Sequence, residues 1–285
     1  MKIVKKVTKW ADAYQRDHAW LAFPIAVVKR YGDDKTGRQA ALITYYTFLS
    51  IFPLLLIFLS LITLIAGNSP ELHAKISDQV FQYFPALGDD LRNNVQTLTA
   101  TGIALVLQIL VLLYGARGLA AMLQEAFNNV WHIQKKHRPG FVGDNLRSFG
   151  MMAAVGLGVI LGTVVSYALG NVFDVSFIGA LVLTLLNVAF TIGLFLIVFR
   201  LGTSNQIALR TLVPGAIIAG LGVLVVQHFG TYIMGQQLPK LQGTYGSFAV
   251  TLGMLFWIYL QAQIIMYALE ITAVRAQRDW PKKLF

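Results

Sequence analysis

The sequence has no cysteine and little charge. None of its 285 residues is cysteine, and only 13% are Asp, Glu, Lys or Arg, whereas an ordinary soluble domain carries about a quarter charged residues. Without cysteine the chain has no disulfide framework, no thiolate zinc site and no cysteine nucleophile. The low charge, together with 56% hydrophobic residues, indicates that water is not the main solvent of this chain.

The sequence also lacks the motifs that mark common enzyme classes. It has no G-x-S-x-G elbow, no Walker loop and no H-x-H or H-E-x-x-H metal spacing. Its histidines are scattered: His18, His73, His132, His137 and His228. The basic stretch Lys135-Lys136-His137-Arg138 would suit a nucleic acid, but a basic cytoplasmic loop explains it without further assumption. We therefore expect no enzymatic activity, no metal or other cofactor and no nucleic-acid partner.

What the sequence does have is a set of long apolar runs. Each is about 20 residues or longer, which is the length a helix needs to cross the hydrocarbon core of a bilayer. The runs do not alternate as the strands of a membrane barrel would, so they predict helices. The predicted fold class is all-α, a polytopic membrane protein with six transmembrane helices at 39–66, 98–123, 149–170, 178–201, 208–230 and 245–274. This division gives an N-terminal segment 1–38, a membrane domain 39–274 and a tail 275–285.

The basic residues lie unevenly between the runs. Counted together with Arg117, Arg200 and Arg210 near the ends of spans, twenty Lys and Arg fall on one side of the six spans and three on the other. The positive-inside rule therefore places both termini in the cytoplasm and the loop 67–97 outside, with no role assigned to that loop. The first run follows 38 largely polar residues and lacks a small-residue cleavage site, so we expect it to be a span and not a cleaved signal.

The N-terminal segment carries an amphipathic pattern. The apolar residues Ile3, Val7, Trp10 and Tyr14 recur at helical spacing. The lysines fall mostly on other positions of the helical wheel. The pattern predicts an interfacial helix on the anionic inner leaflet, with membrane lipids as partners. Simple anchoring is favoured over recognition of a particular lipid.

Four ionisable residues lie inside or at the edges of the spans, where a charge costs about 2.5–3.5 kcal/mol on insertion scales. They form a predicted cytoplasmic charge cluster of Arg117, Arg200, Arg210 and Glu270. Glu270 has no basic residue one turn onward in its own helix, so its cation is expected on another helix. The cluster is either a set of structural pairs and snorkelling side chains or a cytoplasmic gate.

Polar residues inside the spans define a predicted path for a solute. Pro53 should kink the first span, and polar side chains just before it could line a cavity. The path consists of Tyr45, Tyr46, Ser50, Pro53, Gln108, Asn187, Gln227, Tyr245, Gln261 and Gln263.

Glycines raise two further expectations. Gly115 and Gly118 flank Arg117, which indicates either a broken helix that meets a solute or a close approach by a neighbouring helix. Gly158 and Gly162 form a GxxxG step, for which helix packing is the favoured interpretation.

Several segments resemble the YihY/BrkB family of bacterial inner-membrane proteins, long mislabelled ribonuclease BN. They are Ala41–Pro53 with its aromatic pair, serine and proline, Phe127–Trp131, Arg210 with Pro214-Gly215-Ala216, and Tyr245–Phe248 followed by Trp257, Tyr259 and Glu270. The chain departs from the family pattern in having Ala268-Leu269-Glu270-Ile271-Thr272 for Gly-Ala-Glu-Leu-Asn and no proline in Leu201–Thr203.

The resemblance implies a six-helix protein of the bacterial inner membrane. We interpret the chain as a transporter or translocator of a lipid or another amphipathic or anionic solute. The alternative is a scaffold or envelope-assembly factor without transport, and a membrane-bound ribonuclease comes third. The sequence does not indicate the solute, a coupling ion or an oligomeric state.

Overall fold

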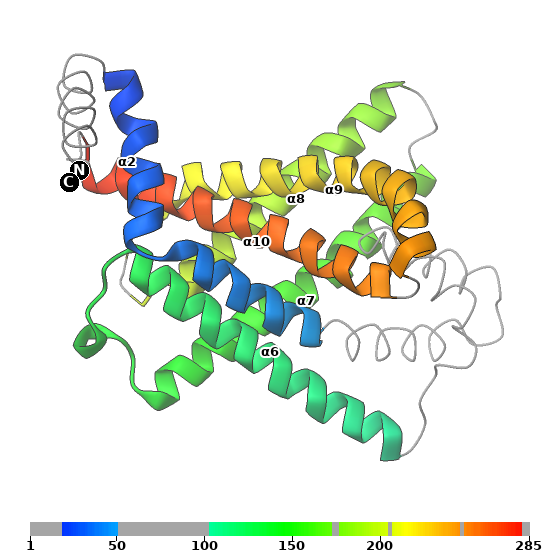
Figure 1. The fold of residues 1–285 in the computed structure, drawn as a ribbon, viewed down its shortest axis with the longest axis horizontal. Helices are drawn as coiled ribbons and strands as arrows, with labels where there is room; N and C mark the ends of the chain where they lie inside the picture. Colours follow the sequence, from blue (N-terminus) through cyan, green and yellow to red (C-terminus); the bar gives the residue numbers. More distant parts are fainter. Residues whose placement is uncertain (1–18, 51–102, 173–176, 205–206, 246–247, 281–285) are drawn as a thin grey trace.

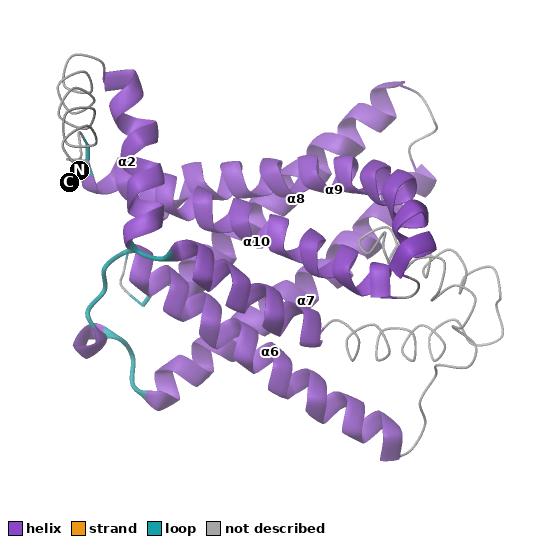
Figure 2. Cartoon of the chain, in the orientation of Figure 1, coloured by secondary structure: helices purple, strands orange, loops and turns teal. Residues whose placement is uncertain are grey.

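The structure is a computed structural model that describes residues 19–50, 103–172, 177–204, 207–245 and 248–280. All regular structure in these ranges is helical, as Figure 2 shows, which confirms the all-α prediction for the described part. Residues 36–50 are helical. The other helices are α2 (Ala19–Asp33), α6 (Ile103–Val130), the short 3₁₀ helix η2 (Lys135–His137), α7 (Phe141–Val172), α8 (Phe177–Gly202), α9 (Leu209–Tyr245) and α10 (Phe248–Gln277).

Four of the described helices are long and apolar enough to cross a membrane, over Ile109–Val130, Leu181–Gly202, Leu209–Gly230 and Phe248–Gln277. They overlap the second, fourth, fifth and sixth predicted spans. The third predicted run lies within the continuous helix α7, and the first begins in the helix 36–50. Pro53, the amphipathic pattern at 3–14 and the loop 67–97 lie outside the described residues, so six spans stay a prediction.

The long helices pack in chain order. α9 lies against both α8 and α10, α7 packs between α6 and α8, and α2 crosses one end of α10, as Figure 1 shows. The end of the bundle that holds α2 also holds the loop 131–140 and the turn between α8 and α9. We call this the α2 end.

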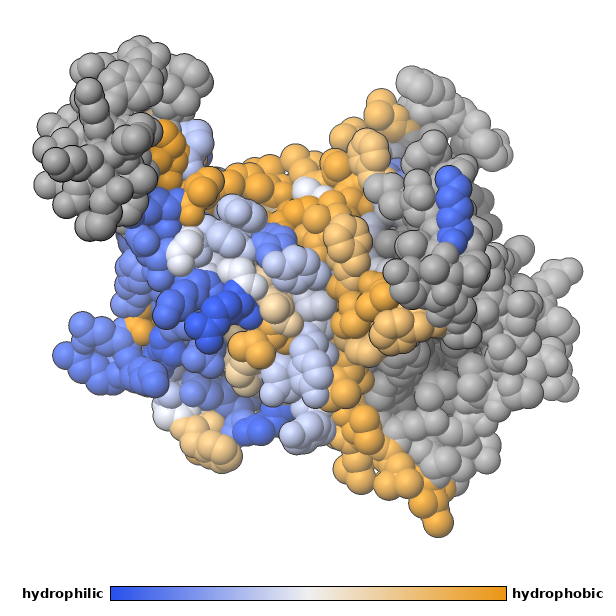
Figure 3. Space-filling view, in the orientation of Figure 1, coloured by the Kyte–Doolittle hydropathy of each residue, from blue (hydrophilic) through white to orange (hydrophobic). Residues whose placement is uncertain are grey.

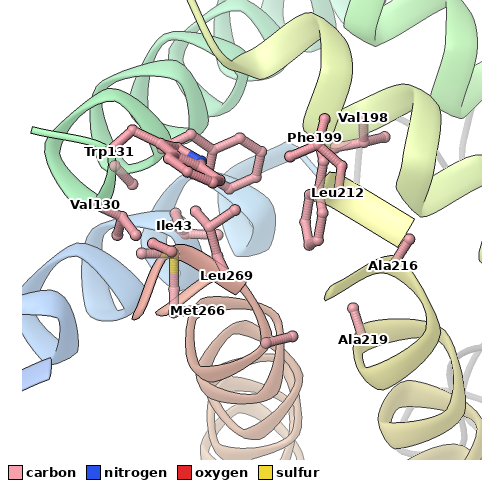
Figure 4. Close-up of a cluster of buried hydrophobic side chains, with 14 of the residues drawn as sticks. Ile43, Val130, Trp131, Val198, Phe199, Leu212, Ala216, Ala219, Met266 and Leu269 are labelled. Atoms are coloured by element: carbon pink, nitrogen blue, oxygen red, sulfur yellow. The ribbon is translucent and has the colours of Figure 1, made fainter. Parts of the chain in front are cut away.

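The buried apolar core lies at the α2 end. Phe127, Phe199, Leu212, Met266 and Leu269 are fully buried there. Figure 4 shows Met266 and Leu269 of α10 beside Val130 and Trp131 at the end of α6. The rings of Phe127 and Phe199 meet edge to face at 5.3 Å, a favoured aromatic geometry that joins α6 to α8.

Glycines set the closest helix contacts. A Cβ added at Gly158 or Gly162 would meet Leu194 or Phe190 of α8, which confirms the packing interpretation of the GxxxG step. Gly115 and Gly118 face the helix 36–50 in the same way, and α6 runs through them without a break. Of the two alternatives for these glycines, the structure therefore favours close approach of a neighbouring helix.

The surface divides along the bundle. Figure 3 shows hydrophilic residues gathered around the α2 end and hydrophobic residues over much of the visible remainder. The N-terminal half of α6, for example, exposes Val106, Leu107, Leu110 and Tyr114. A contiguous apolar surface of this kind suits lipid and not water.

Candidate functional site

A buried arginine is the centre of the polar contacts at the α2 end. Arg30 of α2 has no exposed side-chain surface. Its Nη1 atom donates a hydrogen bond of 2.7 Å to the side chain of Gln277, and its Nη2 atom donates to the backbone oxygen of Val130. One guanidinium thus holds α2 against the end of α6 and the end of α10, because its fork of donors can serve several acceptors at once.

Three carboxylates surround the same guanidinium. The Nε atom of Arg30 lies 3.4 Å from Glu270 Oε2 and 3.5 Å from Asp34 Oδ2, and its Nη1 atom lies 3.4 Å from Asp279 Oδ2. The side chain of Glu270 is as fully buried as that of Arg30. We call Arg30, Asp34, Glu270 and Asp279 the Arg30 network. Among the described residues Arg30 is the cation that all three carboxylates share.

Glu270 also joins the network to the helix 36–50. Its Oε1 atom accepts a hydrogen bond of 2.6 Å from Thr36 Oγ1, and both side chains are buried. Thr36 is the first residue of that helix, directly after the turn at residues 34–35. The carboxylate of Glu270 therefore connects α10 to α2 and to the start of the next helix.

The predicted partners of Glu270 lie elsewhere. Arg117 Nε donates to Asn145 Oδ1 at 3.1 Å, Arg200 Nη1 donates to the backbone oxygen of Ile207 at 3.0 Å, and Arg210 is exposed. None of these three arginines pairs with Glu270 in the described part of the chain. The cation does come from another helix, but that helix is α2, which the sequence analysis placed outside the membrane domain. The signal that could have found it is the i,i+4 pair of Arg30 and Asp34.

Further contacts dock α2 beside the network. His132 Nε2 lies 3.0 Å from Asp34 Oδ1, and Phe23 meets Trp280 edge to face at 5.3 Å. Tyr31 stacks on Tyr267 with ring centroids 4.0 Å apart.

The hydroxyl of Tyr31 donates to Gln263 Oε1 on α10. Burial, with a smaller contribution from Tyr267, raises the pKa of Tyr31 above its ordinary value. The phenol therefore keeps this donor role to a higher pH than a free tyrosine would.

The structure places the predicted path residues in several surroundings. Tyr46 and Ser50 pack against the glycines of α6, and Ser50 donates to the backbone oxygen of Tyr46. Tyr45 and Asn187 are exposed, and Asn187 accepts a hydrogen bond from Thr191 within α8. Gln263 is joined to α2, the helix that carries Arg30, through its bond to Tyr31.

The remaining path residues are less defined. Gln227 of α9 and Gln261 of α10 are half-buried. Pro53 and the side chains of Gln108 and Tyr245 lie outside the described residues. The path as a whole stays a prediction.

A pocket of about 450 Å³ lies between α6, the loop after it and the start of α7. Its charged lining residues are Arg117, Glu125, Lys135, Arg138 and Asp144. Arg117 is its one member from the predicted charge cluster. Sequence reasoning missed the pocket because its lining comes from three segments, whose proximity only the packing of α6 on α7 establishes.

The floor of this pocket is polar and buried. Gln124, Asn128 and Ser148 line it, and each is at most 5% exposed. Gln124 Nε2 donates to Ser148 Oγ at 2.8 Å and to the backbone oxygen of Asp144 at 3.3 Å. Asn128 Oδ1 accepts a hydrogen bond of 2.8 Å from the backbone nitrogen of Ser204. These bonds fix the floor, because each buried amide is held by a named partner.

No group of three or more His, Cys, Asp or Glu side chains in the described ranges is arranged to hold a metal ion. The guanidinium, ammonium and carboxylate side chains around the pocket can bind charged and polar groups.

The helices, their apolar surface and the charged α2 end define an α-helical membrane protein. The sequence model of the family described as Virulence factor BrkB matches residues 27–283. The chain therefore belongs to this family, which confirms the resemblance seen in its motifs.

Its relatives are bacterial. A UPF0761 membrane protein of Alcanivorax borkumensis is 26% identical over 264 residues, covering 88% of this chain and 59% of the relative. One of Vibrio vulnificus is 26% identical over 280 residues, covering 93% and 86%, and one of Pseudomonas aeruginosa is 24% identical over 266 residues, covering 89% and 63%. The chain thus spans less than two thirds of the first and third of these relatives. Their names state a membrane protein and no enzymatic activity, and no solved structure matches the chain.

Proposed function

We propose that the chain is a six-span protein of the bacterial inner membrane that translocates a lipid or another amphipathic solute. In this proposal both termini are cytoplasmic and the α2 end faces the cytoplasm. The Arg30 network, which includes Glu270, acts there in place of the gate that was expected of the cluster Arg117, Arg200, Arg210 and Glu270. Membership of the BrkB family and four helices long enough to span a membrane support the membrane location.

The observation that carries the proposal is the complete burial of Arg30 and Glu270 between α2, α6, α10 and the helix 36–50. A buried ion pair seldom stabilises a fold more than apolar residues of the same size would. Ionisable residues inside membrane bundles usually belong to pathways and switches. The contacts of Arg30 are all at one end of the bundle, so their release would free α2 from α10 and open that end.

The neutral variant Glu270→Gln tests the gate. Gln keeps the shape and an acceptor oxygen for Thr36 but removes one charge from Arg30. A hydrogen bond to a charged group is worth about 1.5–3 kcal/mol, so the closed α2 end should lose about tenfold or more in population. We expect translocation to fall accordingly, because alternating access requires that end to close. The measurement is dithionite bleaching of NBD-labelled phospholipids in proteoliposomes.

The control is Arg275→Gln, which changes an exposed charge five residues away on α10 and should translocate like the wild type. Glu270→Gln protein that translocates at the wild-type rate would contradict the gate. Wild-type protein that moves no labelled lipid faster than protein-free vesicles would contradict transport and leave the scaffold alternative.

The orientation has its own test. Because the chain has no cysteine, single cysteines at Asn68 and at Ala276 give unambiguous labels. The split of 20 to 3 basic residues predicts that an impermeant maleimide labels Asn68→Cys in intact cells and Ala276→Cys only after permeabilisation. The reverse pattern would place the α2 end outside.

A further inference from the structure

The pocket between α6 and α7 carries both signs of charge without pairing them. Three cations and two carboxylates line it. Arg117 contacts Asn145, and Arg138 contacts Asn129 and Ile133, so their partners are neutral. In the described part of the chain no ion pair joins any two of the five charged residues. Each sign therefore stays available to a ligand.

The cations keep unused donors. Arg117 donates to Asn145 through Nε alone, which leaves both Nη atoms for another acceptor. Arg138 uses Nε and Nη2, which leaves Nη1. Lys135 is exposed and lines the pocket. Guanidinium and ammonium groups so placed fit the oxygens of a phosphate.

The two carboxylates of the pocket come from segments that contact each other. Gln124, which precedes Glu125 on α6, donates to the backbone oxygen of Asp144 on α7. This bond brings the segments that carry the two carboxylates together. A purely anionic ligand would meet repulsion from Glu125 and Asp144, whereas a primary ammonium would donate hydrogen bonds to both.

Apolar side chains stand beside the pocket. Phe141, Val142 and Leu146, in the first two turns of α7, are at least 73% exposed. Phe141 also lines the pocket. Large apolar residues exposed next to a charged pocket suit the boundary between headgroups and acyl chains.

We propose that this pocket binds the headgroup of a phospholipid that carries a phosphate and a primary ammonium, the chemistry of phosphatidylethanolamine. The phosphate contacts Arg117, Lys135 and Arg138, and the ammonium contacts Glu125 and Asp144. The inference rests on the proposed function, of which it names the substrate class. It requires only binding and no movement of the lipid.

The test is native mass spectrometry of the purified full chain in detergent, titrated with short-chain phosphatidylethanolamine, phosphatidylcholine, phosphatidylglycerol and inorganic phosphate. We expect phosphatidylethanolamine to bind about tenfold more tightly than the other lipids, the value of one or two charged hydrogen bonds. The trimethylated ammonium of phosphatidylcholine cannot donate to the carboxylates, and the glycerol headgroup has no ammonium.

Two variants separate the two halves of the pocket. Glu125→Gln should abolish the preference for phosphatidylethanolamine over phosphatidylcholine and keep binding of both. Lys135→Gln should weaken all phospholipids alike. Both residues are exposed, so neither change should prevent folding, which thermal melting checks. Arg275→Gln, far along the chain on α10, is the matched control and should bind like the wild type.

Several outcomes would overturn the inference. They are tighter binding of phosphatidylglycerol, unchanged selectivity in Glu125→Gln, and displacement of lipid by inorganic phosphate at equal concentration, which would indicate a free-anion site. Selective binding without translocation in proteoliposomes would leave the inference standing and contradict the proposed function. Translocation without headgroup selectivity would contradict the inference and leave the proposed function standing.

Discussion

Replacing Arg30 with alanine should lower the free energy of unfolding by about 3–5 kcal/mol, the usual cost of removing one partner of a buried ion pair. The loss is large because Arg30 is the cation that Asp34, Glu270 and Asp279 share. Without it Glu270 stays fully buried beside other carboxylates, and the backbone oxygen of Val130 loses its donor.

The comparison with Glu270→Gln makes this prediction specific. That variant leaves Arg30 with two carboxylates and keeps an acceptor for Thr36, so its free energy of unfolding should fall by about 1.5–3 kcal/mol, less than that of Arg30→Ala. The measurement is unfolding in SDS followed by tryptophan fluorescence, in which Trp280, packed on Phe23 of α2, reports the docking of α2. Equal stability of Arg30→Ala and Glu270→Gln would contradict the central role of Arg30.

Hydropathy predicted the long helices because a bilayer imposes a length on each apolar run. The run 178–201 differs from α8 by one residue at each end, and 245–274 differs from α10 by three. The run 208–230 ends well before the C-terminal end of α9. That helix continues to Tyr245 through a more polar stretch. Hydropathy measures the apolar length and gives no information on how far a helix continues beyond it.

The Arg30 network shows what the sequence could not provide. Glu270 was recognised because a carboxylate in an apolar run is costly. Arg30 carries no such signal, because it lies outside the six long apolar runs and is buried by the docking of α2 on α10. The choice among arginines therefore needed tertiary structure. The pocket was missed for the same reason, since its basic loop also satisfies the positive-inside rule.

The contact between α9 and α10 next to Glu270 gives the second large effect. A Cβ added at Gly215 would lie 2.1 Å from Thr272 Oγ1 and 3.2 Å from the backbone oxygen of Ala268. These two residues lie on either side of Glu270 in α10. Gly215→Val should therefore push α10 away from α9 and cost about 1–3 kcal/mol or more, as overpacking of a filled core does. The displacement should also disturb the Arg30 network and lower translocation.

A second substitution tests whether the close approach is the cause. Thr272 Oγ1 donates only within its own helix, to Ala268, so Thr272→Ala alone should cost little and should make room for a methyl group at Gly215. The double variant with Gly215→Ala should then melt closer to the wild type than Gly215→Ala alone, whereas independent sites would give additive losses. Gly193→Ala, on α8 with no atom within 4 Å of the added Cβ, is the matched control and should be neutral. If Gly215→Val melts like Gly193→Ala, α9 and α10 do not meet at Gly215. In that case the packing of α9 does not position the turn of α10 that carries Glu270.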